Sequence, residues 1–362
     1  MLPITEMISV VRSTVLCELS DGAGLLAVLR WATRLWSLVA RGERRWQRAQ
    51  ERLGLSVPWL YLFSVTWRCN LRCAGCYAGG YRPGREMELA DIERVIREAC
   101  ELGGYLFFIL GGEPMMLPGL LDTLAGIKDG LFFLFTNGTT MQSADVDRLA
   151  HTPNVLPFIS MEGDEALTNQ RRGPGVGQKV ADAMHALARA HVLFGTSTMV
   201  THRNVRLVTS PEWFDRLWGE GVRFALLLDY FPFACSLDPS LVLTDQDRAL
   251  KREALANRPV NARPFVANLP PDEYHGSGCQ AAGTGLLHIN ADGYVEPCLF
   301  SHFAVDNVKD KPLVEVLGSP FFCRLRARFA NGDHPTGECL LFAQADEVEA
   351  IARQTGALST EG

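Results

Sequence analysis

The stretch WRCNLRCAGCYAGG, residues 67–80, sets three cysteines within eight residues directly after the apolar run WLYLFSV at 59–65. The run has the length and the apolar continuity of a strand that is buried on both faces, as in a parallel sheet. Cys69, Cys73 and Cys76 are therefore predicted to lie on the loop that follows a strand. In parallel α/β folds such loops build the active site. The spacing C-x3-C-x2-C lets three thiolates converge on one small object.

Downstream of this loop, short apolar runs alternate with amphipathic helical segments as far as residue 230. Six β-then-α units in succession predict an α/β fold with a parallel sheet and helices outside it, either a partial barrel or a doubly wound sheet. Segments such as ELADIERVIREACEL, SADVDRLA and QKVADAMHALARA have the pattern of helices. The runs predicted as strands are WLYLFSV, YLFFIL, LFFLFT, VLPFIS, VLFGTSTMV and VRFALLLDY.

Changes in composition along the chain predict five regions. After the α/β core the sequence becomes polar and proline-punctuated, and then changes to glycines, a short hairpin (LLHINADGYVEP) and scattered cysteines. The predicted regions are a helical segment at 1–57, the core at 58–237, a helix and linker at 238–275, a small cysteine-bearing domain at 276–345 and a C-terminal tail at 346–362.

Composition restricts the partners. The chain has 362 residues, is 47% hydrophobic and carries a formal charge of −6, so it can bury a sizeable core and is not expected to bind nucleic acid, which favours a basic surface. The N-terminus lacks the pattern of a signal peptide, and no run of about 18 uncharged apolar residues predicts a membrane span. We therefore expect a cytoplasmic protein whose ten cysteines are metal ligands or buried thiols rather than disulfides.

The three clustered thiols fit an iron–sulfur cluster better than zinc. Tetrahedral zinc requires a fourth ligand, and residues 67–80 contain no His, Asp, Glu or further Cys. In a [4Fe–4S] cluster three cysteines hold three irons and leave the fourth iron open. An incompletely ligated metal is typical of a catalytic site. A zinc site and three incidental core cysteines are the alternatives.

The motif CNLRCAGC on the first β/α loop resembles the radical S-adenosylmethionine (SAM) enzymes. This resemblance implies a partial (β/α)6 TIM-like barrel, in agreement with the six units above. It also implies that Cys69, Cys73 and Cys76 hold a [4Fe–4S] cluster whose open iron is chelated by the amino and carboxylate groups of SAM. The cluster, reduced by a protein such as flavodoxin or ferredoxin, then cleaves SAM to a 5′-deoxyadenosyl radical that removes hydrogen from a substrate.

Further motifs follow at successive strand ends, namely LGGEP at 110–114, FTNG at 135–138 and SMEG at 160–163 followed by RRG. By the resemblance, backbone groups and the carboxylate of the first motif receive the methionine ammonium, and the later motifs contact the ribose or carboxylate of SAM. The alternatives are an ordinary turn at the second motif and a solvated basic turn at Arg171 and Arg172. One departure from the family is Gly75, with Tyr77 just after it, where many members carry an aromatic residue before the third cysteine. The implied SAM-binding residues are Gly111, Gly112, Glu113, Pro114, Asn137, Ser160 and Arg172.

A second cysteine set lies near the C-terminus. Cys279, Cys298 and Cys339 resemble the Twitch extension, the shorter relative of the SPASM domain, which implies one auxiliary [4Fe–4S] cluster. The resemblance does not assign the fourth ligand of this cluster. Cys323, on a helix beside two phenylalanines, fits a buried thiol better, and His302 is a weaker candidate. Buried apolar packing is the alternative for the set, and core thiols are predicted at Cys17, Cys100 and Cys235.

The N-terminal segment GLLAVLRWATRLWSLVARGERRWQ is a basic amphipathic helix that carries tryptophan. Its apolar face is predicted to pack on the barrel. The alternatives are peripheral contact with a membrane surface and a grip on an apolar substrate. The residues of this face are Leu25, Val28, Leu29, Ala32, Leu35, Trp36 and Val39.

The sequence as a whole indicates a radical SAM enzyme that acts on an unidentified substrate. A peptide, a protein or another natural product is one substrate class, since SPASM and Twitch extensions are common in enzymes that modify peptides. A lipid or isoprenoid modified at a membrane surface is the alternative, suggested by the N-terminal helix. A non-catalytic iron–sulfur electron carrier is a distant alternative, because it would not need LGGEP or SMEG at successive strand ends.

Overall fold

The computed structural model describes residues 25–81, 85–232, 238–259, 262–269, 279–281, 284–329 and 339–360. The chain divides into two compact units, and each is described by itself. Among the described residues, none of the helices combines the length and the apolar character needed to span a membrane. The first unit is formed by Met1–Ser37, Leu71–Tyr77 and Thr136–Leu269, and the second by Leu38–Asn70, Ala78–Phe135 and Pro270–Gly362.

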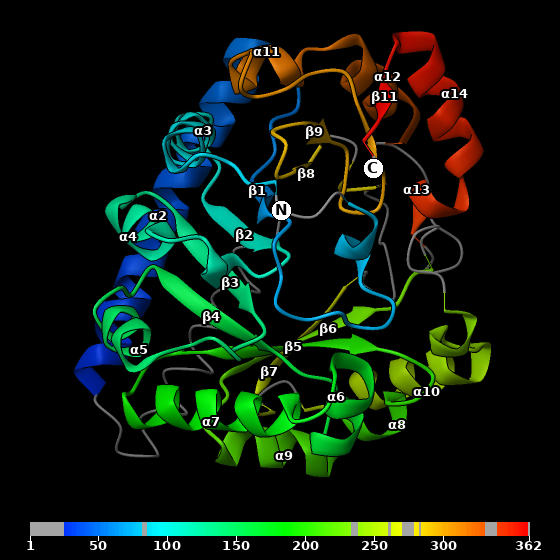
Figure 1. Cartoon of the computed structure of the whole chain (residues 1–362). Coiled ribbons are helices and arrows are strands. Elements are labelled where there is room, and N and C mark those ends of the chain that lie inside the picture. The colour runs from blue at the N-terminus through cyan, green and yellow to red at the C-terminus, as the bar shows by residue number, and fades with distance from the viewer. Residues whose placement is uncertain are drawn as a thin grey trace. The chain divides into compact units, whose positions relative to one another are not determined.

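The second unit is built on a mostly parallel sheet in the order β9-β8-β1-β2-β3 (Figure 1). Strands β1, β2 and β3 pair in parallel, and β8 pairs in parallel with the other edge of β1. Strand β9 turns back antiparallel to β8 and so completes the predicted hairpin. The bounds are β1 Leu60–Thr66, β2 Leu106–Gly111, β3 Leu131–Thr136, β8 Leu286–Ile289 and β9 Val295–Glu296.

The sequence forms this sheet because its strands are apolar on both faces. All seven residues of β1 are buried. On one face Phe107 stacks between Tyr61 and Phe132, with ring centroids 5.6 and 5.3 Å apart. Figure 1 shows α3 (Leu89–Glu101) and α4 (Leu120–Gly126) alongside β1–β3, and α3 turns its apolar stripe inward. The α3 stripe that is buried comprises Ile92, Val95, Ile96, Ala99 and Cys100.

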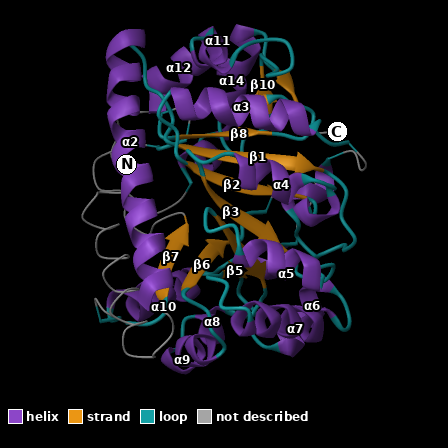
Figure 2. Ribbon diagram, turned by 90° about the vertical axis from the view of Figure 1, so that its left-hand side faces the viewer, coloured by secondary structure: helices purple, strands orange, loops and turns teal. Residues whose placement is uncertain are grey.

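The first unit contains four parallel strands in the order β4-β5-β6-β7, and Figure 2 shows helices α7, α8 and α9 beside them. Side-chain caps begin several of these helices, as the sequence chemistry predicts. The Asp164 carboxylate accepts a hydrogen bond from the Leu167 amide, for example. The bounds are β4 Val155–Ser160, β5 Gly195–Val200, β6 Phe224–Asp229, β7 Phe265–Leu269, α5 Ser143–Ala150, α6 Glu165–Arg172, α7 Val176–Arg189, α8 Val205–Val208, α9 Pro211–Gly219 and α10 Asp245–Ala256.

The C-terminal part of the second unit adds short helices and a two-stranded sheet. Strand β10 pairs antiparallel with β11, close to the end of the described chain. The bounds are β10 Phe303–Ala304, α11 Leu313–Leu317, α12 Pro320–Phe329, α13 Leu340–Ala343, α14 Ala345–Thr355 and β11 Leu358–Ser359; the 3₁₀ turns are η1 Tyr77–Gly80, η2 Pro114–Met116 and η3 Pro239–Leu241.

The structure confirms all six predicted strands and the three helices named with them. The prediction of a helix and linker at 238–275 is wrong in one part, because residues 265–269 form β7, paired in parallel with β6. Strand β7 is only half-buried, and its sequence FVANL is short, contains Asn268 and stands between Pro264 and Pro270. The predicted tail contains α14 and β11. The domain boundaries stay predictions.

The long N-terminal helix α2 (Leu25–Leu53) belongs to the second unit over residues 38–53, and Val39 of the predicted apolar face is buried there. Leu38 and Val39 are buried there, and the Trp46 indole donates to the Val57 carbonyl at 2.6 Å. Trp36 is 51% exposed although it was assigned to the apolar face. Most side chains between residues 25 and 35 lie outside the described set. The predicted membrane contact is not shown.

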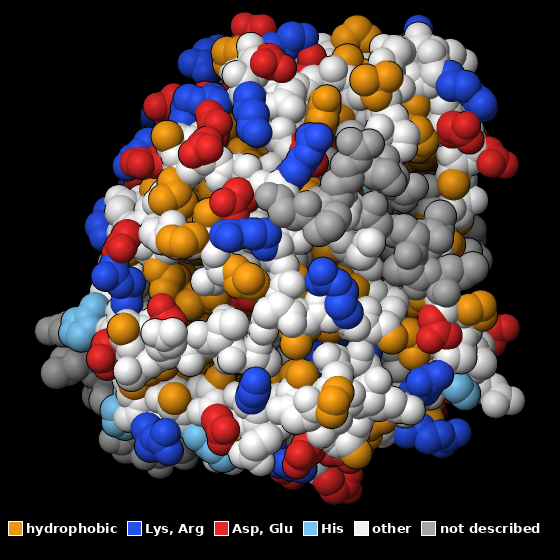
Figure 3. All heavy atoms as spheres, in the orientation of Figure 1, with side chains coloured by type: hydrophobic (Ala, Val, Ile, Leu, Met, Phe, Trp, Pro, Cys, Tyr) orange, Lys and Arg blue, Asp and Glu red, His pale blue; other side chains and the backbone are white. Residues whose placement is uncertain are grey.

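The surface carries charges of both signs. Figure 3 shows Lys and Arg side chains interspersed with Asp and Glu on the face turned to the viewer, in keeping with the formal charge of −6. A face with interspersed charges gives no concentrated positive field for a polyanion.

Candidate functional site

In the second unit, the glycine motif at the end of β2 contacts the segment that leads from β1 to Cys69. The Gly112 amide donates to the Thr66 carbonyl at 2.7 Å, and the Glu113 amide donates to the Arg68 carbonyl at 2.8 Å. A Cβ atom on Gly112 would lie 2.2 Å from the Arg68 carbonyl oxygen and 3.1 Å from the Cys69 Cβ. Only glycine permits this approach of two backbones. The motif therefore shapes the backbone beside the first cysteine.

The remaining residues of this motif are buried. Glu113 is 1% exposed, and its carboxylate accepts a hydrogen bond from the Met115 amide at 3.0 Å, at the start of η2. Pro114 occupies the first position of this turn, where a missing amide hydrogen costs nothing. Gly111 has a φ of +130°, a conformation that favours glycine. Their contact with the methionine ammonium stays a prediction.

Gly112→Ala tests how much this close approach matters. The added methyl group must displace the Arg68 carbonyl, which is backbone and cannot rotate away, so we expect a loss of about 1–3 kcal/mol in the free energy of unfolding and weaker SAM binding. Urea unfolding and calorimetric titration with SAM measure the two effects. Gly126→Ala is the matched control, because nothing lies within 4 Å of its Cβ position. Equal behaviour of the two variants would contradict the argument.

In the first unit, the part of the cysteine loop that carries Cys73 and Cys76 lies beside the end of α6. The Ala74 amide donates to the Arg171 carbonyl at 3.0 Å. The Arg171 and Arg172 side chains are only 9% and 11% exposed, and both reach the same carboxylate oxygen, Oε1 of Glu162. The Nη1–Oε1 and Nε–Oε1 distances are 2.6 and 2.7 Å. The alternative of a solvated basic turn is therefore wrong.

These charges act on the thiol of Cys73. Burial raises its pKa, Arg172 and Arg171 lower it, and Cys76 and Glu162 raise it again, with a net upward direction. Burial outweighs the charges, but the two guanidinium groups oppose it and favour the thiolate, the form that binds metal. The donor set therefore fits an anionic iron–sulfur cluster held by these thiols.

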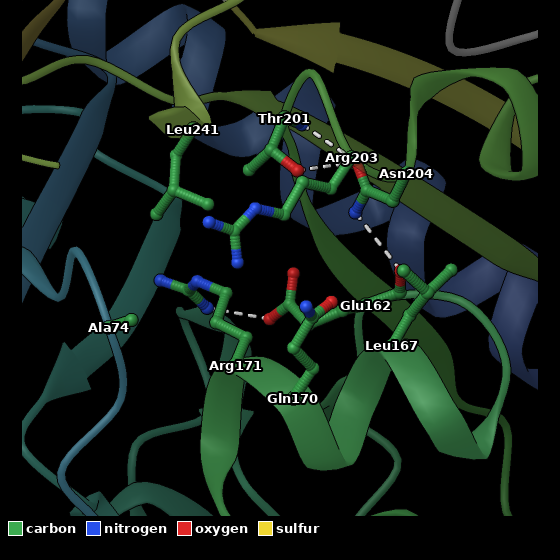
Figure 4. Close-up of a pocket in the computed structure, with 9 residues that line it drawn as sticks. All are labelled: Ala74, Glu162, Leu167, Gln170, Arg171, Thr201, Arg203, Asn204 and Leu241. Carbon is green, nitrogen blue, oxygen red and sulfur yellow. Dashed lines mark hydrogen bonds and ion pairs between the residues drawn. The ribbon is translucent and has the colours of Figure 1, made fainter. Parts of the chain in front are cut away.

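Sequence reasoning missed the role of Glu162, although the residue stands within the SMEG motif. Its side chain is 2% exposed, and a cavity of about 20 Å³ lies beside it, lined also by Ala74, Arg203 and Leu241 (Figure 4). The second carboxylate oxygen, Oε2, is buried and accepts no hydrogen bond from the described residues. The cavity has room for about one water molecule, and a water there would satisfy this oxygen.

Asn137 and Ser160 take part in local hydrogen bonds of the first unit. The Asn137 Oδ1 atom accepts from the amide and the hydroxyl of Thr139 at 2.9 and 2.6 Å, which confirms that it shapes a turn. The Ser160 hydroxyl lies 3.1 Å from the hydroxyl of Ser197 on β5. Contact of either residue with SAM stays a prediction.

The second cysteine set lies in the second unit, close enough for the charge of Cys339 to act on Cys279 and on Cys298. Cys279 lies beside the end of α12, where its amide donates to the Phe329 carbonyl at 3.1 Å, while Cys298 follows β9 and Cys339 precedes α13. All three thiols are buried. Burial raises the pKa of Cys279 to about 12, and the neighbouring charge of Cys339 contributes. Burial, Cys339 and Cys279 likewise raise the pKa of Cys298.

This proximity fits a metal cluster. Cys339 raises the pKa of Cys279 and of Cys298, so these thiols are costly to ionise together unless a metal binds and removes their protons. Within the described ranges, no three His, Cys, Asp or Glu side chains are grouped as ligands of a single metal ion. The four irons of a cluster instead accept thiolates at separate positions.

The prediction that Cys323 is a buried thiol is wrong. Its side chain is exposed, and the thiol points to the Gly318 carbonyl at 3.6 Å. The reason is helical periodicity, because the inner face of α12 is occupied by Phe321, Phe322, Leu325 and Phe329. Cys100 is buried as predicted, and burial raises its pKa to about 12. Cys17 and Cys235 lie outside the described residues.

Comparison with known proteins identifies both parts of the chain. Residues 63–228 match the radical SAM superfamily, and residues 279–340 match the SPASM family, an iron–sulfur cluster-binding domain. An AdoMet-dependent heme synthase of Methanosarcina barkeri is 27% identical over 292 residues, which cover 72% of this chain and 82% of the relative. A PqqA peptide cyclase of Ruegeria pomeroyi is 28% identical over 278 residues, which cover 72% and 73%.

Solved structures show the same fold. Streptococcus suis SuiB bound to S-adenosylmethionine matches with a TM-score of 0.64 at 18% identity, over 75% of this chain and 68% of that one. The mostly parallel sheets with surrounding helices are thus those of a partial TIM-like barrel. The chain belongs to the radical SAM superfamily and carries a C-terminal SPASM-type iron–sulfur domain.

Proposed function

We propose that this radical SAM enzyme abstracts hydrogen from a peptide or protein substrate, and that Cys69, Cys73 and Cys76 hold the cluster that cleaves SAM. The enzyme class and its cofactors, a [4Fe–4S] cluster, SAM and an auxiliary cluster, follow from the family. The observation that carries the ligand assignment is the setting of Cys73 and Cys76, next to two buried arginines that share one carboxylate. The PqqA peptide cyclase relative supports the peptide class by its name.

The residues that contact the cysteine loop contribute separate parts of this chemistry. Bound there, a reduced cluster supplies the electron that breaks a carbon–sulfur bond of SAM. Gly111 and Gly112 have no side chains that would obstruct SAM as it approaches the thiolates. Arg171 and Arg172 balance the negative charge of the thiolates, and Glu162 fixes the two guanidinium groups in place.

Cys279, Cys298 and Cys339 are the proposed ligands of the auxiliary cluster. Their shared burial excludes bulk water, and low local polarity is one of the factors that set a cluster's reduction potential. Cys323 does not serve as the fourth ligand in this proposal, because its thiol lies on the exposed face of α12. An open iron at this cluster could bind the substrate.

Metal content and a substrate panel test the proposal. Anaerobically reconstituted protein should be brown and hold roughly eight irons, as expected for two [4Fe–4S] clusters. With SAM and dithionite, peptides encoded by short reading frames beside the gene should stimulate 5′-deoxyadenosine formation and change in mass. About four irons per chain would contradict the presence of an auxiliary cluster. Stoichiometric zinc without iron would refute the whole proposal.

The same panel distinguishes the substrate classes. A porphyrin arm is included because one relative is named a heme synthase. Turnover of the porphyrin without any peptide reaction would replace the peptide class, and so would turnover of an isoprenoid in vesicles. The described residues offer no support for the lipid alternative.

A further inference from the structure

The second unit contains a buried polar network that the chemistry above does not use. It begins at Trp67, two residues before Cys69, whose indole ring stacks on the ring of Tyr81. The two ring centroids are 3.8 Å apart and the planes differ by 8°. Tyr81 is 6% exposed and follows the cysteine loop directly after η1. The stacked pair therefore brings together the start and the end of the segment that carries the three loop cysteines.

From the Tyr81 hydroxyl the network continues into the segment around Cys298. The hydroxyl is hydrogen-bonded to Nδ1 of His302 and lies 3.4 Å from Oε2 of Glu296. Glu296 stands two residues before Cys298, and His302 stands four residues after it. One phenol thus touches both sides of the turn that carries an auxiliary-cluster cysteine.

A second connection runs from Glu296 to strand β1. The Glu296 Oε2 atom lies 2.7 Å from Nδ1 of His288, and the other ring nitrogen of His288 lies 2.8 Å from the hydroxyl of Ser64. The side chains of His288, Glu296 and Ser64 are all fully buried. Strand β8, which carries His288, is itself paired with β1. Strand β1 therefore leads along the chain to Cys69 and, through Ser64, His288 and Glu296, to the segment of Cys298.

The Glu296 carboxylate is saturated by its neighbours. Its Oε1 atom accepts hydrogen bonds from the Asn290 amide group and the Thr360 hydroxyl, both at 2.6 Å. A fully buried carboxylate is tolerated only when it is paired and hydrogen-bonded in this way. Such a network has one preferred geometry, because each missed bond leaves a buried polar group unsatisfied. With only apolar contacts between them, the same two segments could shift relative to each other at a lower cost in free energy.

A third contact fixes the turn of the hairpin. The Trp67 indole donates to the Asp292 carboxylate at 3.2 Å, and the Arg85 guanidinium donates to its other oxygen at 2.6 Å. The Trp67 amide in turn donates to the Arg85 carbonyl at 2.7 Å. The hairpin is held at its turn by Asp292 and at its base by Glu296 and His302.

We propose that Tyr81, His302 and Glu296 are positioning residues that couple the segment of Cys69 to the segment of Cys298. A displacement on either side is passed to the other, so each cluster responds to substitutions made in the segment of its partner. The proposal rests on the proposed function, in which both cysteines are cluster ligands. It assigns no chemical step to the phenol or to the imidazole.

Tyr81→Phe is the first test, because it keeps the ring stack on Trp67 and removes only the hydroxyl. Tyr61→Phe is the matched control, since the Tyr61 hydroxyl is buried and has no hydrogen-bond partner among the described residues. Both substitutions are made with Cys73→Ala, so that the auxiliary cluster is observed alone. The midpoint potential and the electron paramagnetic resonance spectrum of that cluster are expected to change with Tyr81→Phe and to stay unchanged with Tyr61→Phe.

The reciprocal test starts from the auxiliary side. His302→Leu should weaken SAM binding on the order of fivefold or more, the usual range for coupled sites, and alter the spectral change that SAM causes at the loop cluster. His302→Asn should restore both, because the amide group of asparagine can occupy the place of Nδ1. Coupling must appear in both directions, since it is a property of equilibrium binding.

The outcomes separate this proposal from the function on which it rests. Wild-type iron content and its loss in Cys73→Ala test the ligand assignment alone. If that assignment holds while Tyr81→Phe and His302→Leu leave the distant cluster at its wild-type potential and spectrum, the coupling is refuted. If His302→Asn behaves like His302→Leu, the hydrogen bond to Tyr81 is not the coupling element. Should Tyr81→Phe fail to fold, the His302 pair decides the matter.

Discussion

Cys73→Ala is expected to abolish 5′-deoxyadenosine formation under dithionite, with or without substrate. Cys69, Cys73 and Cys76 are the proposed protein ligands of the cluster that reduces SAM. Loss of one thiolate leaves two protein ligands, which is too few to retain this cluster. Cys298→Ala instead removes a ligand of the auxiliary cluster and leaves the loop untouched. That variant should still cleave SAM slowly but fail to convert substrate. Chromatography of 5′-deoxyadenosine and mass spectrometry of the substrate measure the two effects.

Cys323→Ala is the control for both variants, because its thiol is exposed and stands apart from either set. It should match the wild type in iron content and in turnover. Unchanged SAM cleavage in Cys73→Ala would refute the assignment of the loop cysteines. Complete loss of SAM cleavage in Cys298→Ala would show that the C-terminal cysteines mainly hold the fold together.

Glu162→Gln is expected to lower the free energy of unfolding by about 3–5 kcal/mol, the range for breaking a buried ion pair by removing one partner. Its carboxylate is the counterion of two guanidinium groups that are only 9% and 11% exposed, so water screens them little. Urea unfolding of the metal-free protein measures the loss. Glu165→Gln, three residues further on an exposed site, should have little effect. A loss below about 1 kcal/mol would place Glu162 with ordinary surface ion pairs.

The same variant changes the cysteine loop electrostatically. Burial, Cys76 and Glu162 raise the pKa of Cys73, whereas Arg172 and Arg171 lower it, so removal of the Glu162 carboxylate takes away one of the raising influences. The pKa of Cys73 should therefore fall, and the thiolate should appear at lower pH than in the wild type. Alkylation of the metal-free protein by iodoacetamide, followed against pH and resolved by peptide mass spectrometry, measures this shift. An upward shift would contradict the sign of the argument.

Most of the strand pattern could be predicted because most strands of the core are apolar on both faces; β5, with Thr196, Ser197 and Thr198, is the exception. Helix–strand alternation then left few architectures open, and a parallel sheet followed. Strand β7 was missed because its run, FVANL, is short, contains Asn268 and stands between two prolines. The pairing of β8 with β1 could not be predicted either, because the residues LLHI carry no information about which strand lies beside them.

Side-chain burial was harder to predict than strand position. A solvated turn is an alternative that the sequence leaves open for Arg171 and Arg172, and only the structure places both side chains against Glu162. Cys323 read as buried because it adjoins two phenylalanines, yet neighbours in sequence point to different faces of a helix. In each case the deciding partner lies on another turn or another element, where local composition carries no information.

The sequence by itself determined the chemistry of this protein, because three thiols within eight residues and glycines at a strand end need only short-range spacing to be recognised. Tertiary structure alone decided what surrounds those thiols. It placed two arginines on one buried carboxylate, drew Cys279, Cys298 and Cys339 together from distant segments, and connected Tyr81 to His302 across 221 residues of chain. The physical reason is that burial and charge pairing are properties of the folded neighbourhood, and this neighbourhood is assembled by chain segments whose separation in sequence leaves no local trace.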